Sequence, residues 1–355
     1  MKRLMDIPAY REDVVRTATQ DLPWARLKGK TLLVTGGTGQ IGSFLIDVLH
    51  EAVADCRILL LGRNEGRARE RFSSYGFGPF LKFIQWDACS RSIPSISEPI
   101  DFIFHLASNV HPVAYATDPI GTISANVMAL DGLLSLASEK ACERCLFASS
   151  NEIYGENRGD VELFDEKYCG YIDCNTLRAG YPESKRCGEA LCQAYCSQRH
   201  LDCVVARLTR TFGPTLLPTD TKASSQFFGH ALRGEDIVLK SAGTQFYSYQ
   251  YVSDSVAGLL TVFFRGCRGE AYNVADESGD ITLHDLACLI AKKAGVRVVF
   301  GQPNVVEATG FSRATKARLD GSKLQALGWH PNYAIQEAVG RTYDIMSEIY
   351  RADYK

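Results

Sequence analysis

Two side chains four positions apart could together take a proton from a hydroxyl group. They are Tyr181 and Lys185, in the stretch Tyr-Pro-Glu-Ser-Lys. Pro182 suits the first turn of a helix, and residues four apart share one helix face, so both side chains can meet the same ligand. A phenol with a pKa of about 10 is a poor base at neutral pH, but a neighbouring ammonium favours the phenolate and lowers that pKa. The pair therefore predicts a base that acts on a substrate hydroxyl.

Further polar side chains follow a short apolar run upstream. The run predicts a strand over residues 144–149, and Ser150 and Glu152 come directly after it. Ser150 could orient a substrate oxygen, while Glu152 is either a reacting carboxylate or an ordinary solvated one. Neither pattern is specific alone, but both at the edge of one sheet predict a single catalytic site.

A glycine-rich turn predicts a dinucleotide site. The buried strand expected at residues 32–35 breaks into Gly36, Gly39 and Gly42 before an amphipathic helix over residues 43–50. Glycines let the backbone turn sharply and approach a pyrophosphate, whose charge then lies at the helix N-terminus. An ordinary strand-to-helix turn can carry such glycines too, so the context decides.

The end of the second strand bears on the cofactor. An acidic residue there usually holds the adenosine 2′-hydroxyl, whereas an arginine can pair with a 2′-phosphate. This strand ends Leu-Gly-Arg63-Asn64, so Arg63 favours NADP over NAD. The alternative for Arg63 is a solvated loop arginine. Asp87, after the third strand, either hydrogen-bonds adenine or caps a turn.

Strand and helix patterns alternate along most of the chain, which predicts a doubly wound, Rossmann-type parallel sheet with its ligands at the carboxyl ends of the strands. Beyond Gly213 the pattern becomes irregular. We therefore expect an N-terminal helical extension at 1–29, a dinucleotide-binding domain at 30–213, and a smaller α/β substrate lobe at 214–355 with some segments returning to the first domain. Further strands are expected at 57–61, 81–86, 101–105, 201–208 and 237–239, and further helices at 10–19, 64–72, 119–139, 182–199 and 224–233 and near residues 254, 282 and 335.

Composition narrows the class of ligand. The 355 residues carry a formal net charge of -2 with no basic tract, which disfavours nucleic acid or a membrane as the main partner and favours a small polar ligand. The start of the chain lacks the apolar core of a signal peptide, so a cytoplasmic protein is expected. Among twelve cysteines, Cys142 and Cys145 form the only C-x-x-C, and no second pair accompanies them, so no metal site is expected.

Several motifs together make the chain resemble an extended short-chain dehydrogenase/reductase of the NAD-dependent epimerase/dehydratase group, which acts on nucleotide sugars. The resemblance covers roughly residues 30–345. The matching stretches begin at the glycine turn and include His105-Leu106-Ala107-Ser108, Ser149-Ser150-Asn151-Glu152-Ile153-Tyr154-Gly155, Tyr181-Pro182-Glu183-Ser184-Lys185, Arg207 through Phe212-Gly213-Pro214, Tyr251-Val252-Ser253-Asp254 and Tyr272-Asn273-Val274.

The resemblance implies a site of three parts: a catalytic set, a bound nicotinamide cofactor and a nucleotide-sugar subsite. The catalytic set is Ser150, Glu152, Tyr181 and Lys185. The expected cofactor contacts are Gly36, Thr38, Gly39, Gln40, Ile41, Gly42, Arg63, Asn64, Asp87, Ala88, Leu106, Ala107, Ser108, Asn126, Tyr181 and Lys185. The expected substrate contacts are Asn109, Ser150, Asn151, Arg210, Tyr247, Lys316 and Arg318.

The implied reaction starts with oxidation at sugar C4 and then diverges. Glu152 matches the base of 4,6-dehydratases and a glutamate of sugar-acid decarboxylases, which favours chemistry at C5. Asn151 stands where dehydratases have an aspartate acid, and an amide cannot donate that proton as a general acid. Dehydration is therefore in doubt, whereas decarboxylation needs no such acid. The alternatives are a 4-epimerase or 4-reductase and, from another class, a dinucleotide sensor without turnover.

Two further departures concern the nucleotide. The segment Thr209-Arg210-Thr211 stands where relatives show an asparagine, and Tyr247 replaces a frequent diphosphate-binding arginine. Arg210 is therefore expected at a phosphate or a sugar carboxylate, with Lys316 and Arg318 as other diphosphate candidates. The resemblance also implies a homodimer built on the helices at 119–139 and 182–199. Cys192 and Cys196 either contribute to that interface with nearby Glu189 and Leu191 or pack on the sheet.

Overall fold

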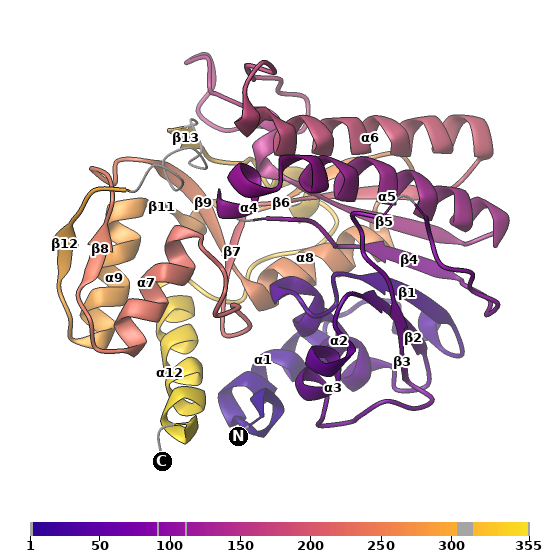
Figure 1. Cartoon of the computed structure of the whole chain (residues 1–355), viewed down its shortest axis with the longest axis horizontal. Coiled ribbons are helices and arrows are strands. Elements are labelled where there is room, and N and C mark those ends of the chain that lie inside the picture. The colour runs from indigo at the N-terminus through magenta and orange to yellow at the C-terminus, as the bar shows by residue number, and fades with distance from the viewer. Residues whose placement is uncertain (1–2, 91, 111, 304–314, 354–355) are drawn as a thin grey trace.

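A seven-stranded parallel sheet forms the centre of the computed structural model, which describes residues 3–90, 92–110, 112–303 and 315–353 (Figure 1). The strand order is β10-β6-β5-β4-β1-β2-β3, and every neighbouring pair is parallel. This order confirms the predicted doubly wound α/β fold, and β10 is a late segment that returns to the first sheet. The strands are β1 (Thr31–Thr35), β2 (Arg57–Gly62), β3 (Leu81–Gln85), β4 (Phe102–His105), β5 (Arg144–Ser150), β6 (Cys203–Leu208) and β10 (Ala271–Val274).

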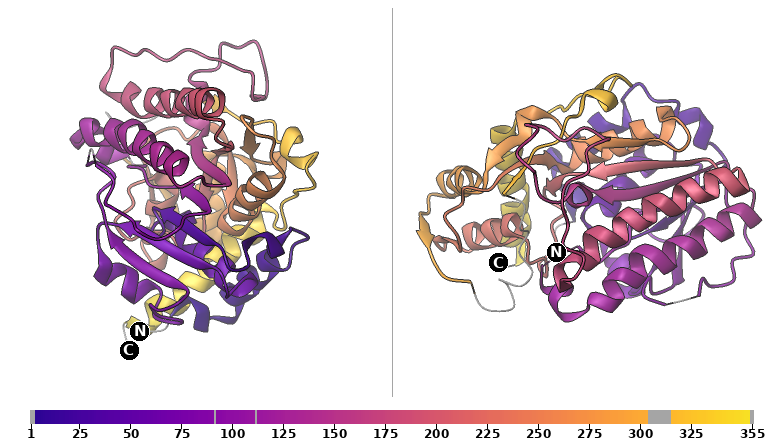
Figure 2. Two further views of the ribbon diagram at one scale, coloured as in Figure 1. Left: turned by 90° about the vertical axis from the view of Figure 1, so that its right-hand side faces the viewer. Right: turned by 90° about the horizontal axis from the view of Figure 1, so that it is seen from above.

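Helices cover both faces of this sheet, because successive strand residues point to opposite sides. Leu32 and Val34 pack with the helices α2 (Gln40–Ala52), α3 (Glu65–Arg71) and α8 (Val252–Arg265). Leu33, between them, packs on the other face, where α5 (Pro119–Glu139) and α6 (Gly180–Arg199) run side by side after the short helix α4 (Pro112–Thr117) (Figure 2). The boundaries lie within three residues of the predicted ones.

The α5 helix is long and apolar enough by composition to cross a membrane, but half of that window is buried inside the molecule. On the neighbouring helix, Cys192 and Cys196 pack onto the sheet, and the Glu189 carboxylate pairs with Arg207 of β6 at 2.7 Å. These three side chains face the sheet, so the second of the two alternatives for them is confirmed. Among the described residues no group of three or more His, Cys, Asp or Glu side chains is arranged to hold a metal ion.

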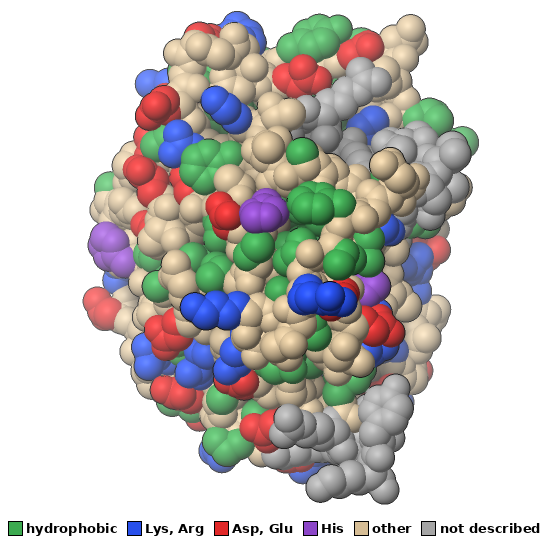
Figure 3. Space-filling model, turned by 90° about the vertical axis from the view of Figure 1, so that its left-hand side faces the viewer, with side chains coloured by type: hydrophobic (Ala, Val, Ile, Leu, Met, Phe, Trp, Pro, Cys, Tyr) green, Lys and Arg blue, Asp and Glu red, His purple; other side chains and the backbone are tan. Residues whose placement is uncertain are grey.

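The second lobe is built on two small sheets. One has the order β11-β9-β13 with β7 also paired to β9, and the other pairs β12 with β8. Figure 3 views this lobe, whose face carries acidic and basic side chains interspersed around scattered apolar ones. The strands are β7 (Arg210–Phe212), β8 (Ile237–Leu239), β9 (Phe246–Tyr251), β11 (Asp280–Thr282), β12 (Val298–Phe300) and β13 (Lys316–Ala317), and the helices are α7 (Ala223–Leu232), α9 (Leu283–Ala294), α11 (Ser322–Gln325) and α12 (Ile335–Asp353).

The N-terminal extension forms α1 (Pro8–Ala18), which joins the two lobes. On one side the Tyr10 hydroxyl donates to the Asp47 carboxylate of α2 at 2.5 Å. On the other, the fully buried Asp13 carboxylate accepts hydrogen bonds from the hydroxyls of Tyr251 and Tyr333, each at 2.6 Å, and forms an ion pair with Arg341 at 2.6 Å. The extension is therefore an integral clamp.

Candidate active site

A cavity of about 540 Å³ lies at the carboxyl ends of the strands, between the large sheet and the second lobe. Its wall includes the glycine turn, the end of β5, the start of α6 and residues of β7 and β9. Seven basic side chains line the cavity against three acidic ones, so it suits ligands with several negative charges. The basic residues are Arg63, Arg67, Arg178, Lys185, Arg210, Lys222 and Lys240, and the acidic ones are Asp87, Glu152 and Asp220.

The glycine turn between β1 and α2 leaves no room for side chains. Gly36 has φ +71°, and a Cβ there would lie 2.7 Å from the Ala107 backbone nitrogen. A Cβ on Gly42 would lie 2.3 Å from the Gly36 carbonyl oxygen. The free N–H groups of the α2 N-terminus and the closely approaching backbone fit a pyrophosphate. The expected cofactor contacts on the cavity wall here are Gly36, Thr38, Gly39, Gln40, Ile41, Gly42, Leu106, Ala107 and Ser108.

The adenosine end of the cavity is lined by Arg63, Asp87 and Ala88, together with Arg67, which the sequence reasoning did not single out. Asn64 does not line it. Its side chain caps α3 by accepting a hydrogen bond from the Arg67 backbone N–H at 2.8 Å. The side chain of Asn64 is thus engaged as a helix cap, and its contact with the cofactor stays a prediction.

Asn126 also lies away from the cavity wall. It is fully buried, accepts from the Ser108 hydroxyl at 2.7 Å and donates to the Ser184 hydroxyl at 2.9 Å. This asparagine therefore holds the Ser108 side chain in place, and its own contact with the cofactor stays a prediction. Asn109, predicted to contact substrate, does line the cavity.

Tyr181, Ser150 and Lys185 meet at the middle of the cavity wall, as their sequence positions predicted. Ser150 ends β5, and its hydroxyl hydrogen-bonds with the phenol of Tyr181. The Lys185 ammonium donates to the Ala148 carbonyl oxygen at 2.8 Å and lies 6.0 Å from the centre of the Tyr181 ring. A tyrosine, a hydroxyl and an amine are thus held by one strand end and one helix start.

The charge state of this set differs from the expectation. Burial raises the pKa of Tyr181 above its ordinary value, and the Glu152 carboxylate adds to the rise, while hydrogen bonding to Ser150 opposes it. Burial lowers the pKa of Lys185 to about 7, against the opposing effect of Glu189. A neutral phenol beside a partly neutral amine results. In contrast to the expected lowering, the net pKa of Tyr181 is raised, because desolvation of the phenol outweighs the hydrogen bond with Ser150 and the positive charge of Arg178.

Glu152 forms an ion pair that sequence reasoning missed. Its Oε2 lies 2.6 Å from the Arg178 Nη2. Arg178 belongs to a 3-10 helix at Leu177–Ala179, just before α6. Its guanidinium lies 4.6 Å above the centre of the Tyr115 ring, which stacks on Tyr181 at 4.8 Å. The spacing of Arg178 three residues before Tyr181 was the available signal, since it puts both on neighbouring turns of one segment.

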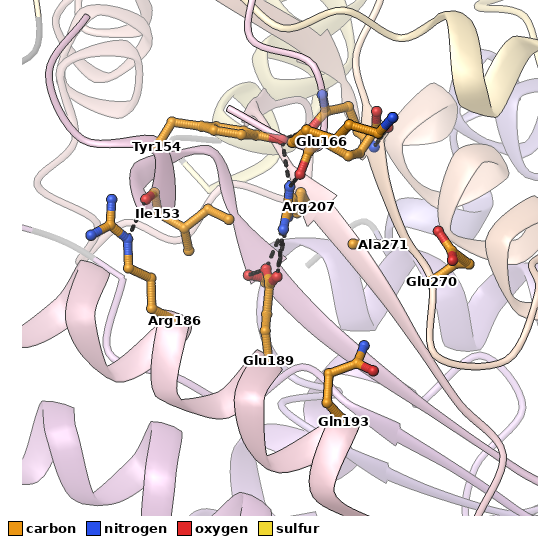
Figure 4. A network of polar contacts seen from close by, with 12 residues as sticks. Ile153, Tyr154, Glu166, Arg186, Glu189, Gln193, Arg207, Glu270 and Ala271 are labelled. Atoms are coloured by element: carbon orange, nitrogen blue, oxygen red, sulfur yellow. Dashed lines mark hydrogen bonds and ion pairs between the residues drawn. The ribbon is translucent and has the colours of Figure 1, made fainter. Parts of the chain in front are cut away.

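A buried ionic network holds the end of β5 beside α6 (Figure 4). Arg207 of β6 pairs with Glu189 at 2.7 Å and donates to the Tyr154 hydroxyl at 2.9 Å. Glu189 in turn accepts from the Ser149 hydroxyl at 2.5 Å. Because Glu189 lies one helical turn after Lys185 and Ser149 precedes Ser150, the network sets the distance between the two halves of the catalytic set.

The second lobe contributes a stacked pair. The Arg210 guanidinium lies 3.4 Å from the centre of the Tyr247 ring, both residues line the cavity, and the Arg210 Nη1 has no hydrogen-bond partner among the described residues. The expected diphosphate candidates Lys316 and Arg318 lie outside the cavity wall, and Arg318 instead lies 3.6 Å from Asp280. Their positions do not support that role. Asn151, next to Ser150, does line the cavity.

Comparison with known proteins adds four findings. Residues 32–275 match the model of the NAD dependent epimerase/dehydratase family. The chain is 30% identical over 337 residues to UDP-glucuronic acid decarboxylase 1 of Xenopus tropicalis, covering 93% of this chain and 76% of the relative. Among solved structures it resembles an epimerase of Methanothermobacter thermautotrophicus, with a TM-score of 0.77, 22% identity, and 93% and 95% of the two chains covered. It also resembles the UDP-glucuronic acid 4-epimerase of Bacillus cereus in complex with UDP-glucuronic acid and NAD, with a TM-score of 0.76, 19% identity, and 90% and 100% covered.

Proposed function

Because the chain belongs to the NAD-dependent epimerase/dehydratase family, we propose that it decarboxylates a sugar acid carried on a nucleoside diphosphate. The observation that carries the proposal is the end of β5, where Asn151 and Glu152 follow Ser150 on the cavity wall. A carboxylate suits chemistry at C5, while the amide cannot act as the acid that loss of water requires. The curated relative from Xenopus, which bears a decarboxylase name, supports the same direction.

The first half of the reaction uses Tyr181, Ser150 and Lys185. Tyr181 takes the proton of the sugar C4 hydroxyl, and Ser150 holds the same oxygen through its own hydroxyl. A bound nicotinamide cofactor supplies the hydride acceptor at C4 and, when oxidised, a positive charge that favours the phenolate. Lys185, with a pKa of about 7, can exchange protons near neutrality and so return the tyrosine to its reactive state.

The second half proceeds from the C4 ketone. The bond between C5 and its carboxyl group breaks, its electron pair passes into the enolate of that ketone, and carbon dioxide leaves. A proton from water then adds to C5, and Tyr181 gives its proton back to the C4 oxygen. The hydride would return to C4 from a bound nicotinamide, which restores the C4 hydroxyl. Glu152 acts as an orienting carboxylate in this reaction, because no proton has to be removed from C5.

The second lobe binds the nucleotide end of the substrate. Arg210 lines the cavity with a buried donor that has no partner among the described residues, and stacking on Tyr247 fixes its guanidinium plane. A guanidinium held this way suits the diphosphate. We assign the diphosphate to Arg210, which compensates for the arginine that Tyr247 replaces.

The proposed function is tested by incubating the cofactor-loaded protein with UDP, dTDP, GDP and CDP sugars, acidic and neutral, and weighing the products. Loss of carbon dioxide from a sugar acid is expected. Loss of water from a neutral hexose would identify a dehydratase. Unchanged mass with altered sugar configuration would identify a 4-epimerase. Bound cofactor without any product would identify a sensor.

We also propose NADP as the preferred cofactor, since Arg63 and Arg67 both line the adenosine end. Arg63→Asp should shift the preference towards NAD, because the new carboxylate repels a 2′-phosphate and accepts from a 2′-hydroxyl. Titration of both cofactors against both proteins measures the shift. An unmoved ratio of the two affinities would reduce Arg63 to a solvated loop residue.

A homodimer is proposed as well. The family resemblance suggested it, and an exposed apolar surface on α5 and just before α6 supports it. That surface consists of Ile120, Ile123, Met128 and Leu177, of which Ile120 is 78% exposed. Exposed apolar side chains clustered in this way favour association with a second copy.

A further inference from the structure

The ion pair between Glu152 and Arg178 lies where desolvation of both charges costs free energy. Their side chains are only 19% and 12% exposed, and both line the cavity beside the catalytic tyrosine. Taking two charges out of water costs about as much as their attraction returns, so such a pair is weak evidence for a stabilising role. Charged groups kept in a cavity wall point instead to a ligand.

The surroundings of Arg178 fix its guanidinium in place. Tyr115 contacts both Arg178 and Tyr181, with 4.6 Å from the guanidinium to the centre of the Tyr115 ring and 4.8 Å between the centres of the two tyrosine rings. The position of Arg178 is therefore tied to the position of the base that acts at C4. Sugar C5 is bonded to C4, so a group on C5 lies within reach of this guanidinium when the C4 hydroxyl lies at Tyr181.

A side cavity of about 60 Å³ opens behind the same pair. It is lined by Glu152, Arg178 and Arg210, among others, and shares these three residues with the main cavity. Such a volume exceeds the space that one water molecule needs, so a carboxyl group fits there. A neutral hydroxymethyl group would fit as well. The preference for one of these two C5 groups therefore depends on the charges around the cavity.

The charges at this side cavity favour a C5 carboxylate over a neutral C5 group. Glu152 alone would repel a carboxylate on C5, whereas a guanidinium beside it attracts that carboxylate and can bridge two of them, because it carries five N–H donors in one plane. We propose that Arg178 recognises the C5 carboxylate of the substrate and makes the site selective for nucleotide-linked uronic acids over neutral hexoses. This inference rests on the proposed function, because it takes the C4 hydroxyl to lie at Tyr181.

The test compares two ligands that differ only at this position, UDP-glucuronic acid and UDP-glucose. Calorimetry on the full chain loaded with reduced cofactor, which cannot accept a hydride from C4 and so prevents turnover, measures both dissociation constants for the native protein and for Arg178→Gln. The native protein should bind the acid more tightly. Arg178→Gln should raise the dissociation constant of UDP-glucuronic acid at least about tenfold and change that of UDP-glucose by less than about twofold. Arg178→Lys should keep part of the preference for the acid, because it keeps the positive charge.

Glu152→Gln should change the affinity for the acid in the opposite direction to Arg178→Gln. Removal of the repelling carboxylate should strengthen binding of the acid or leave it unchanged, and the double variant Glu152→Gln/Arg178→Gln, which leaves neither charge unpaired, should lose the preference. Arg144→Gln is the matched control. Arg144 forms a similarly buried pair with Asp202 at 2.7 Å, at the opposite end of β5, and its loss should leave the ratio of the two affinities unchanged.

Equal weakening of both ligands by Arg178→Gln would overturn the inference and reduce Arg178 to a support for Glu152. A native protein that binds UDP-glucose as tightly as UDP-glucuronic acid would overturn it too. Product analysis separates this result from the proposed function. Selective binding of the acid without release of carbon dioxide would refute decarboxylation and leave the role of Arg178 standing. Release of carbon dioxide by a protein whose Arg178→Gln variant keeps the native ratio of the two affinities would do the reverse.

Discussion

At the scale of single residues, the hydroxyl of Tyr181 is the group whose removal reports most directly on the chemistry. Tyr181→Phe should lower turnover by about 10²- to 10⁴-fold, the range of one positioned acid or base. Cofactor affinity should stay near the native value, because the ring and its stack on Tyr115 remain. Initial rates and a cofactor titration on the same preparation measure both quantities, and native turnover would reject proton transfer by this residue.

The sequence predicted which residues line the cavity wall together where they lie close together in the chain. Tyr181 and Lys185 are four apart, and the three glycines of the turn are three apart, so their neighbours in space are also their neighbours in the chain. Glu152 and Arg178 are 26 positions apart, and nothing local indicates their pairing. Asn64 and Asn126 fit the resemblance, but tertiary contacts turn their side chains to a helix cap and to a serine pair.

At the scale of elements, α1 depends on one carboxylate. Asp13→Ala removes the acceptor of two tyrosine hydroxyls and leaves Arg341 without its buried partner. Loss of one partner from a buried ion pair costs about 3–5 kcal/mol of unfolding free energy. Urea unfolding measures the change, and Asp21→Ala is the control, because its exposed side chain should cost less than about 0.5 kcal/mol. Equal midpoints for the two variants would show that α1 does not clamp the lobes.

The start of α8 predicts a pH effect. Burial raises the pKa of Asp254 to about 6, against hydrogen bonds from Asn332 and Tyr333 that favour the anion. A folded-state pKa above the unfolded value of about 3.9 means that the folded state holds the proton more tightly. Its contribution to stability is therefore complete at low pH and is lost as the pH rises from about 4 through 6.

Asp254→Asn should remove this loss. Relative to the native protein, the variant should gain up to about 3 kcal/mol of unfolding free energy between pH 4 and pH 7, since one pKa unit corresponds to about 1.4 kcal/mol. The amide oxygen can still accept the hydrogen bonds from Asn332. Urea unfolding at both pH values tests the difference between the two proteins, and parallel pH curves would contradict the assignment.

Six of the seven strands of the large sheet could be predicted, because they are short apolar runs with helical patterns between most of them. The seventh, β10, joins the sheet late in the chain and was not predicted. Fewer elements of the second lobe could be predicted. Of its strands, only β8 was predicted, while β7, β11, β12 and β13 have two or three residues each. Strands this short are defined by pairing with partners far along the chain, such as Lys316 with Phe246, and carry no period of their own.

At the scale of the whole molecule, the exposed surface of α5 predicts the oligomeric state. Ile120→Glu and Met128→Glu together should convert a dimer into a monomer, because burial of two charges in an apolar interface is unfavourable. Light scattering at micromolar concentration measures the mass. Phe300→Glu, on β12 of the second lobe, is the control and should leave the dimer intact. A native protein that is already a monomer would end the proposal.

The clamp on α1 also sets an order of events during synthesis on the ribosome. Tyr10 meets Asp47 after only 37 further residues, but Asp13 must wait 238 residues for Tyr251 and 320 for Tyr333. At about 5–20 residues per second, the last of these partners emerges about 15–60 s after Asp13. Throughout that interval the Asp13 carboxylate of the nascent chain has to stay hydrated, because not all of its hydrogen-bond partners are present yet. Closure of the two lobes is therefore one of the final steps of folding, and a chain released before residue 333 cannot complete it.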